Sequence, residues 1–303
     1  MSTPVSAPAK AAPGGWAIAL ALALVYVVWG STYLGIHFAL QGGLPPLLGV
    51  SGARFVVAGV LFFAVLRLRG EAAPTWPQWR TLIVMGGLLL GLGNGMVVLA
   101  EGSGVSSGLA AVAVASVPLW MGLFGLMRGH RPTRAEWIGI AIGFIGVVWL
   151  NAGGTLAASG AGLVYLLIAP VAWAYGSIWS RGRDLPSPFM TAAGQMICGG
   201  VLLCLAGLLH GDRIHALPQG TGLAAWLYLM LFGSIVAFTA YVWLLQHVRP
   251  ALAGSYAYVN PVIAVALGTW LAQERFSAQE FGAMALIVAG VLVINLAKVR
   301  RRP

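Results

Sequence analysis

One stretch of the chain occurs twice, and this repeat constrains the fold more than any other feature of the sequence. Residues 129–151, GHRPTRAEWIGIAIGFIGVVWLN, correspond at a spacing of 144 to residues 273–295, QERFSAQEFGAMALIVAGVLVIN. The coinciding residues include Arg131 with Arg275, Glu136 with Glu280, and Gly146 with Gly290. Each copy is a short polar turn followed by an apolar run that has no charge after its glutamate. The repeat predicts two similar halves, each ending in a transmembrane helix.

The amino-acid composition indicates a membrane protein. Hydrophobic residues make up 59% and charged residues 8% of the 303 residues, and the mean hydropathy is +0.89. A soluble domain carries about 25% charged residues, because polar groups must cover its surface. The formal net charge of +10 is spread between apolar runs and forms no basic patch, which argues against nucleic-acid binding. The sequence therefore predicts an all-α integral membrane protein.

Apolar runs of helical length follow one another along the whole chain. Five helices are expected in a first repeat, residues 16–151, and five in a second repeat, residues 160–297. Residues 1–15, which are small and proline-containing, are predicted to form a disordered tail, and residues 298–303 form a basic C-terminal tail. The ten predicted transmembrane helices are residues 16–38, 46–68, 79–99, 105–127, 135–151, 160–181, 188–209, 222–246, 251–272 and 279–297.

The basic residues predict the orientation of these helices. With a cytoplasmic N-terminus, 14 of the 17 lysines and arginines fall in cytoplasmic segments, and only Arg213 and Arg275 fall on the other side. The remaining one, Arg54, lies within the second helix. Because positive charge concentrates on the cytoplasmic side, both termini are predicted to be cytoplasmic. Each half holds an odd number of helices, so the second half must be inverted in the membrane, as in many secondary transporters.

Two tandem five-helix repeats, each with an arginine-containing turn, a glutamate and a glycine-containing last helix, resemble the EamA-type drug/metabolite transporter superfamily. The resemblance covers residues 16–297, and the chain is most similar to bacterial amino-acid and metabolite exporters. His130 and Gln273 depart from the glutamate and the glycine of the family's two turns. The resemblance implies a ten-helix fold in the bacterial cytoplasmic membrane and the export of a small molecule. We expect that the protein needs no cofactor. Its expected partners are membrane lipid and a small-molecule substrate, and it is expected to be a monomer or a homodimer.

Aromatic side chains form a stripe along the first helix. Tyr26, Trp29, Tyr33 and His37 fall within about 80° of its circumference, at 100° per residue. The stripe crosses the middle of the span, whereas an interfacial belt clusters at the ends. For a single such residue, a packing seam or a belt remains the alternative interpretation. The ring-bearing residues predicted to bind substrate are Trp29, Tyr33, His37, Trp173, Tyr175, Trp179, Tyr241, Trp243 and Tyr256.

Polar side chains inside an apolar span are costly and often mark functional sites. Arg54 is the only charge in the middle of a span, and its counterpart in the second half is the neutral Gln195. We predict that Arg54 contributes to substrate binding, with pairing to a carbonyl or reaching outward as the alternatives. The hydroxyl and amide groups predicted to contribute are those of Ser31, Thr32, Asn94, Ser177 and Asn260.

Prolines and glycines predict where helices bend and where they pack closely. Pro118 and Pro261 occupy matching places in the fourth and ninth helices, and we predict hinges there because proline removes a backbone hydrogen bond. Gly87, Gly91 and Gly95 form a small-xxx-small ridge that predicts close packing of the third helix. The fifth and tenth helices are mostly small and aliphatic and are predicted to be peripheral. The cavity is expected between the first, third, fourth, sixth, eighth and ninth helices.

The sequence favours transport over catalysis. Residues 104–108, GVSSG, match the G-x-S-x-G pattern of hydrolases, but that motif requires a strand-to-helix turn with acid and histidine partners. The histidines show no spacing typical of metal ligands, and there is no phosphate-binding G-x-x-x-x-G-K-[ST] loop. We therefore predict a secondary transporter and not an enzyme, exporting small amphipathic metabolites, mainly amino acids, by alternating access. The alternative is a membrane-embedded enzyme or scaffold that acts on lipid-like substrates.

The acidic residues bear on energy coupling. Proton-driven transporters usually carry a protonatable group on the pathway at membrane depth. Here only Glu101, at the outer end of the third helix, and His37 are candidates for proton coupling. Because no carboxylate lies at the middle of a span, the sequence predicts a facilitator or an exchanger that uses the gradient of its own substrate.

Overall fold

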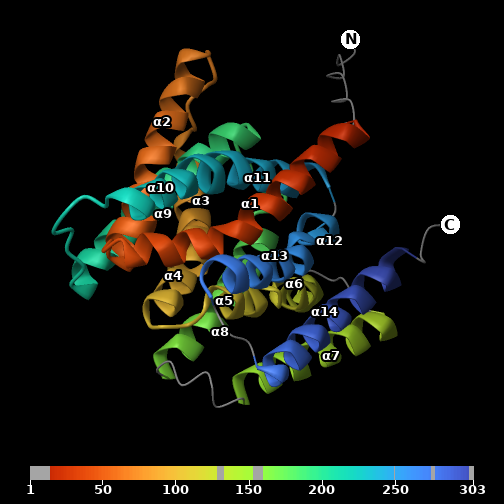
Figure 1. Cartoon of the computed structure of the whole chain (residues 1–303). Helices are drawn as coiled ribbons and strands as arrows, with labels where there is room; N and C mark the ends of the chain where they lie inside the picture. Colours follow the sequence, from red (N-terminus) through yellow and green to blue (C-terminus); the bar gives the residue numbers. More distant parts are fainter. Residues whose placement is uncertain (1–13, 128–132, 153–159, 249, 274–276, 300–303) are drawn as a thin grey trace, which may run out of the picture.

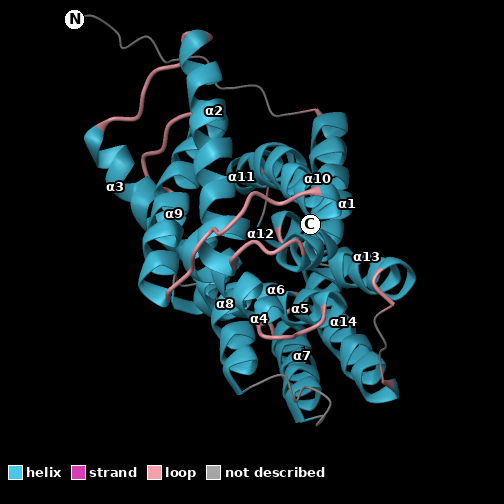
Figure 2. Cartoon of the chain, turned by 60° about the vertical axis from the view of Figure 1, so that its left-hand side comes forward, coloured by secondary structure: helices cyan, strands magenta, loops and turns pink. Residues whose placement is uncertain are grey.

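The computed structural model describes residues 14–127, 133–152, 160–248, 250–273 and 277–299, and every regular element in these ranges is helical (Figure 1, Figure 2). Most of the predicted N-terminal tail and the last four residues lie outside the described ranges. Three of the helices, named η, are π-helices. In chain order the elements are α1 (Gly15–Gln41), η1 (Pro46–Ala53), α2 (Arg54–Leu68), α3 (Trp76–Met85), η2 (Gly86–Asn94), α4 (Gly95–Gly102), α5 (Ser107–Val114), α6 (Val117–Met127), α7 (Arg134–Ala152), α8 (Gly160–Trp179), α9 (Pro188–His210), α10 (Gly220–Tyr228), η3 (Leu229–Ala237), α11 (Phe238–His247), α12 (Pro250–Ala253), α13 (Tyr256–Leu271) and α14 (Ala278–Val299).

These elements occupy the positions of the predicted spans, and several spans consist of consecutive helices. The third span is α3, η2 and α4, and the eighth is α10, η3 and α11. Seven stretches of the described chain are long and apolar enough to cross a membrane. The prediction of an all-helical membrane protein is therefore confirmed for the described residues, whereas ten crossings and cytoplasmic termini stay predictions.

Short polar residues start several of these helices. Ser106 precedes α5, and its hydroxyl oxygen accepts a hydrogen bond from the backbone nitrogen of Leu109 at 3.3 Å. Ser187 precedes α9 and accepts in the same way from Met190 at 3.1 Å. The first backbone N–H groups of a helix have no partner within it, so a side-chain oxygen at this position stabilises the helix start. Ser106 also separates the third and fourth spans at the glycine-rich join.

The two halves interlock through equivalent helices. η1 and α2 of the first half pack along α9, their counterpart in the second half. In the same way α7 packs along α14, and both views show this pair at the edge of the molecule (Figure 1, Figure 2). The fifth and tenth spans are thus peripheral, as predicted. α1 packs against α13 and α10, while α8 packs against η2 and α4.

Glycines allow the third span to approach the seventh closely. A Cβ atom on Gly86 would lie 2.7 Å from the backbone nitrogen of Gly199, and one on Gly95 would lie 2.7 Å from a leucine side chain of α9. The prediction of close packing is wrong for Gly87 and Gly91. A Cβ atom added to these residues would lie 3.4 and 3.7 Å from its nearest neighbour, which is ordinary van der Waals contact. The physical reason is the π-helix η2, because its i→i+5 hydrogen bonds widen the turn and break the four-residue spacing.

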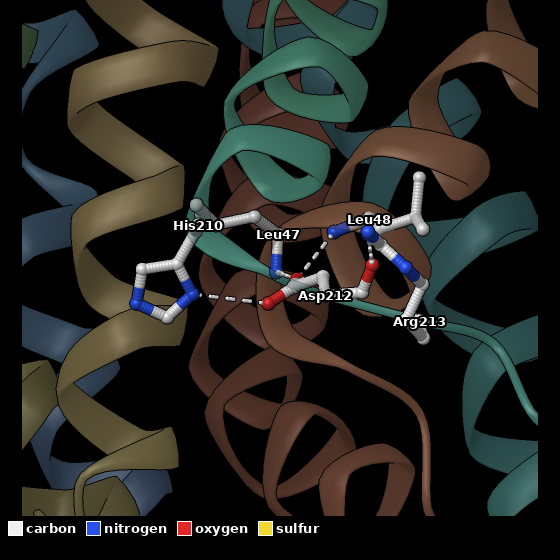
Figure 3. Close-up of polar contacts among 5 residues, drawn as sticks. All are labelled: Leu47, Leu48, His210, Asp212 and Arg213. Carbon is white, nitrogen blue, oxygen red and sulfur yellow. Dashed lines mark hydrogen bonds and ion pairs between the residues drawn. The ribbon is translucent and has the colours of Figure 1, made fainter.

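A carboxylate of the second half caps a helix of the first half (Figure 3). Asp212 directly follows α9, and its Oδ2 accepts hydrogen bonds from the backbone nitrogens of Leu47 and Leu48, both at 2.9 Å. These two residues belong to the first turn of η1. The other carboxylate oxygen lies 3.1 Å from Nδ1 of His210, and the side chain of Arg213 donates to the backbone carbonyl of Asp212. Asp212 thus accepts hydrogen bonds from N–H groups that have no partner within the helix. Its negative charge also interacts favourably with the positive N-terminal end of the helix dipole.

We expect Asp212→Ala to destabilise the protein. The change leaves one buried and one partly buried N–H group without their acceptor, and hydrogen bonds to a charged group contribute about 1.5–3 kcal/mol. The melting temperature in detergent should fall by several degrees. Asp184→Ala is the control, because Asp184 is exposed and accepts a single side-chain hydrogen bond, from Gln78, so its replacement should cost less than about 0.5 kcal/mol. Equal effects of the two changes would contradict the capping role.

Candidate functional site

A cavity of about 70 Å³ lies between helices of both halves. Sites for drug-sized ligands usually measure about 300–1,000 Å³, so the surrounding helices must move apart before a molecule of that size can enter. The lining comes from α1, η2, α4, α5, α8 and α13, and consists of Trp29, Thr32, Tyr33, Ile36, Gly93, Asn94, Val97, Val114, Ala169, Pro170, Trp173, Tyr256 and Asn260.

Seven of the predicted substrate-binding residues are brought together in this lining. They are Trp29, Thr32, Tyr33, Asn94, Trp173, Tyr256 and Asn260. They come from the first, third, sixth and ninth spans, and Val114 adds the fourth. The eighth span, which was also expected to line the cavity, contributes no lining residue. Its rings pack behind the wall, because Phe238 and Tyr241 are almost completely buried against aromatic neighbours.

Five rings form one aromatic cluster, made up of Trp29, Trp173, Phe238, Tyr241 and Tyr256. Trp29 is at its centre and contacts the other four, with ring centroids between 4.9 and 6.4 Å apart. The contacts are edge-to-face or tilted, which are the arrangements that aromatic pairs prefer. Trp29, Trp173 and Tyr256 also line the cavity, so the aromatic cluster closes one of its ends.

Hydrogen bonds fix the rings of the aromatic cluster. The indole nitrogen of Trp29 donates to the backbone carbonyl of Gly233 in η3 at 3.1 Å. The indole nitrogen of Trp173 donates to the hydroxyl of Tyr241 at 3.0 Å, and the hydroxyl of Ser177 lies 2.9 Å from the same oxygen. Both indole N–H groups are therefore paired away from the cavity, and apolar ring surface faces it. Ser177 is not part of the lining. It contributes indirectly, because its hydrogen bond holds Tyr241, which in turn holds the indole of Trp173.

The polar part of the lining, called here the amide wall, centres on Asn94. Its Oδ1 accepts a hydrogen bond from Nη2 of Arg54 at 3.1 Å and lies 3.3 Å from the hydroxyl of Ser51, which also donates to it. The Arg54 guanidinium lies over the ring of Phe55, with 4.3 Å between its carbon and the ring centroid. Arg54 is 3% exposed and does not line the cavity itself. Arg54 therefore influences the cavity through its hydrogen bond to the lining residue Asn94.

Two further amide and hydroxyl groups complete the lining. Thr32 donates its hydroxyl hydrogen to the backbone carbonyl of Trp29 at 2.8 Å. In the amide orientation that satisfies its neighbours, Asn260 donates to the backbone carbonyls of Tyr26 and Tyr256, at 3.2 and 3.1 Å. The amide nitrogen of Asn260 is thereby engaged, and its carbonyl oxygen is the end free to accept.

The other predicted residues near α1 lie outside the lining. The hydroxyl of Ser31 is 2.6 Å from that of Tyr228 in α10, and Nε2 of His37 is 3.0 Å from Nε2 of Gln41. Glu101 lies near the end of α4, one turn beyond the lining residue Val97, and is 7% exposed. The structure therefore buries the carboxylate that the sequence placed at the outer end of its span. A role for Glu101 or His37 in proton coupling stays a prediction.

Three predicted aromatic residues face other surroundings. Tyr175 is 40% exposed and lies on the outside of α8. The ring of Trp179 lies under the guanidinium of Arg183 at 3.4 Å, and that of Trp243 stacks on His247 with centroids 4.4 Å apart. None of the three is among the residues that line the cavity, and a role for them in substrate binding stays a prediction.

The two predicted hinge prolines differ in their surroundings. Pro118 is the second residue of α6, directly after the break that separates α5 from α6. Pro261 lies inside the continuous helix α13. A third proline within a helix, Pro170 of α8, lines the cavity and was not singled out from the sequence. The signal that could have revealed it is the one used for the other two, a proline at membrane depth.

Other lining residues gave weaker sequence signals. Gly93 permits close approach of Trp173, since a Cβ atom at Gly93 would lie 2.7 Å from the indole ring. Ile36, Val97, Val114 and Ala169 are aliphatic and do not differ in type from residues that face lipid. Among the described residues no group of histidine, cysteine, aspartate and glutamate is arranged to hold a metal ion.

Comparison with known proteins places the chain in a family. The EamA-like transporter family matches residues 16–152 and again residues 160–296. The chain belongs to this family. Seven stretches of its described residues are long and apolar enough to cross a membrane, which indicates that this EamA-like transporter is a multi-pass membrane protein.

Relatives of this EamA-like transporter align along most of its length. It is 44% identical over 278 residues to a protein of Escherichia coli K12 named "uncharacterized inner membrane transporter YedA", covering 92% of this chain and 90% of the relative. It is 27% identical over 272 residues to protein PecM of Dickeya dadantii, covering 88% and 89% of the two chains. A crystal structure of 23% sequence identity shares the fold with a TM-score of 0.69, covering 94% of this chain and 99% of the other.

Proposed function

We propose that this protein is a secondary transporter of the bacterial inner membrane that exports small amphipathic metabolites, above all amino acids with apolar or aromatic side chains. The observation that carries the proposal is the cavity itself, whose lining combines aromatic rings with amide and hydroxyl groups. Aromatic faces favour apolar bodies and attract an ammonium group by about 0.5–2 kcal/mol. The amide and hydroxyl groups suit a carboxylate. The name of the Escherichia coli relative supports the membrane assignment.

The position of the aromatic cluster suggests which side of the cavity is closed. Along α1 the lining runs from Trp29 to Ile36, and in the predicted orientation α1 starts in the cytoplasm. The aromatic cluster then lies at the cytoplasmic end of the cavity. Alternating access requires this barrier to open and another to close on the outer side. In this conformation the protein would release substrate outward, as export requires.

A counterflow experiment tests the proposed function. Proteoliposomes loaded with unlabelled phenylalanine should take up radiolabelled phenylalanine faster than protein-free liposomes, because a carrier exchanges the two pools. An imposed membrane potential should not change the rate, since a neutral zwitterion carries no net charge and the potential does about 2.3 kcal/mol of work per charge per 100 mV only on charged species. A pH gradient should not drive accumulation.

Two outcomes would contradict parts of the proposal. If phenylalanine, leucine and other amphipathic amino acids all fail to exchange, the substrate assignment is wrong. If a pH gradient drives accumulation and Glu101→Gln or His37→Ala abolishes it, the transporter is proton-coupled through that residue. A membrane-embedded enzyme, the alternative function, would instead convert its substrate chemically, and the recovered radiolabel would then no longer be phenylalanine.

A further inference from the structure

A buried arginine lies behind the amide wall of the cavity. Arg54 is 3% exposed and begins α2 where the π-helix η1 ends. Its Nε is buried without a hydrogen-bond partner. In the part of the chain that the structure describes, the one ion pair joins His210 and Asp212 and does not involve Arg54. An arginine buried in a membrane without a counter-charge is costly, which indicates that an anion is supplied from elsewhere.

Asn94 connects this charge to the cavity. Its Oδ1 accepts from both Arg54 and Ser51, which uses the two lone pairs of the carbonyl oxygen. This pair of donors fixes the amide so that its oxygen faces Arg54. The NH₂ group, which has two hydrogens to donate, is then the end that Asn94 presents to the cavity. Arg54 polarises this amide in surroundings of low dielectric constant, where its field is strong.

No charged side chain is found among the lining residues. An ammonium group in the cavity therefore meets aromatic faces, hydroxyls and the amide oxygen of Asn260, none of which is charged, while an anion meets a donor held by a buried cation. The positive end of the site lies at the Asn94 wall, and the apolar end lies at the aromatic cluster. The site is asymmetric in charge.

We propose that the carboxylate is the obligatory part of the substrate and the amine is dispensable, so that the site takes aromatic and apolar monocarboxylates as well as amino acids. In this arrangement Asn94 contacts the carboxylate, and Arg54 is a positioning residue that orients Asn94 and supplies the positive potential. The inference rests on the proposed function, because it concerns the same cavity.

A binding experiment on the purified full-length protein tests this without any transport step. Three probes share one aromatic body: phenylalanine, 3-phenylpropanoate, which lacks the amine, and 2-phenylethylamine, which lacks the carboxylate. A ligand that binds the folded state raises its melting temperature. We expect phenylalanine and 3-phenylpropanoate to raise it and 2-phenylethylamine to have no effect at the same concentration. Stabilisation by the amine equal to that by the acid would overturn the inference, as would no stabilisation by the acid.

Variants separate recognition from folding. Arg54→Gln and Asn94→Asp should each weaken binding of the two carboxylates by about tenfold or more, since a charge-assisted hydrogen bond is lost or a repulsive charge is added. Asn94→Asp, which pairs with Arg54, should in addition let 2-phenylethylamine bind. Gln195→Leu is the matched control: Gln195 is the counterpart of Arg54 in the second half, and its buried side chain has no hydrogen-bond partner, so its replacement should leave binding unchanged. If Arg54→Gln alters the affinity for all three probes equally, the role of Arg54 is structural and the inference fails.

The two proposals fail in distinguishable ways. Carboxylate-dependent binding without counterflow would refute transport and keep the carboxylate site. Counterflow of phenylalanine by a protein that binds the amine as well as the acid would keep transport and refute the carboxylate site.

Discussion

We expect Gly86→Ala to lower the melting temperature of the protein, and Gly91→Ala in the same π-helix to leave it unchanged or raise it. The two glycines look alike in sequence, but their surroundings differ. A methyl group on Gly86 would lie 2.7 Å from the backbone nitrogen of Gly199 and 2.9 Å from the carbonyl oxygen of Gln195. Backbone atoms cannot rotate away as a side chain does, so η2 and α9 must separate. Forced overpacking of this kind costs about 1–3 kcal/mol.

The Gly91 variant is the internal control. The nearest atom to its new methyl group is 3.7 Å away, which is an ordinary van der Waals contact. Alanine is a better helix former than glycine by up to about 1 kcal/mol, so the change is neutral or stabilising. Thermal unfolding of both variants in one detergent gives the comparison. A loss of stability at Gly91 as large as that at Gly86 would mean that glycine is needed for the π-helix itself and not for the contact with α9.

The second large effect is expected at Trp29. Trp29→Ala removes a ring that contacts four others and a hydrogen bond to the carbonyl of Gly233. Each aromatic pair contributes about 0.5–1.5 kcal/mol, and truncating a packed tryptophan costs about 3–5 kcal/mol of stability. We expect the apparent affinity for phenylalanine in counterflow to fall by about tenfold or more.

Two further variants define the cause of that loss. Trp29→Phe keeps an aromatic ring but removes the hydrogen bond and part of the ring area, so we expect a smaller loss of affinity. Trp270→Ala changes a tryptophan of α13 that is 76% exposed, and counterflow should be unaffected. If Trp29→Ala exchanged phenylalanine as the unchanged protein does, the aromatic cluster would be a packing element only and the proposed substrate contact would be wrong.

The helices could be predicted from the sequence because a bilayer leaves few choices. Backbone groups must pair within each apolar segment, so the apolar runs and the helices coincide along the described chain. Which side of a helix faces inward was harder to predict. The stripe from Tyr26 to His37 assumes 100° per residue, yet only its middle part, Trp29 and Tyr33, lines the cavity. Thr32 and Ile36 line the cavity beside them, so the inward face of α1 is rotated relative to the stripe, and Tyr26 and His37 contact Ser255 and Gln41 instead.

Features that depend on tertiary contacts escaped the sequence analysis. The π-helix η2 places Gly86, in place of Gly87 and Gly91, in close contact with α9. No residue type in the sequence predicts a π-helix. The capping role of Asp212 has no local sequence signal, because its partners lie 165 and 164 positions earlier in the chain. Asn94 and Arg54 were noticed because polar groups are rare at membrane depth, but their hydrogen bond depends on how the third span packs on the second, where α4 contacts η1.

The pairing of α7 with α14 bears on how the chain is synthesised. A Cβ atom on Gly290 of α14 would lie 2.6 Å from the carbonyl oxygen of Gly139 in α7, so each of these helices presents a narrow glycine surface that only its partner fits. Translation proceeds at about 5–20 residues per second, so α14 leaves the ribosome on the order of ten seconds after α7. During that interval the glycine surface of α7 is without this partner. The pairing of α7 with α14 therefore closes a contact whose first half was made before the second repeat existed.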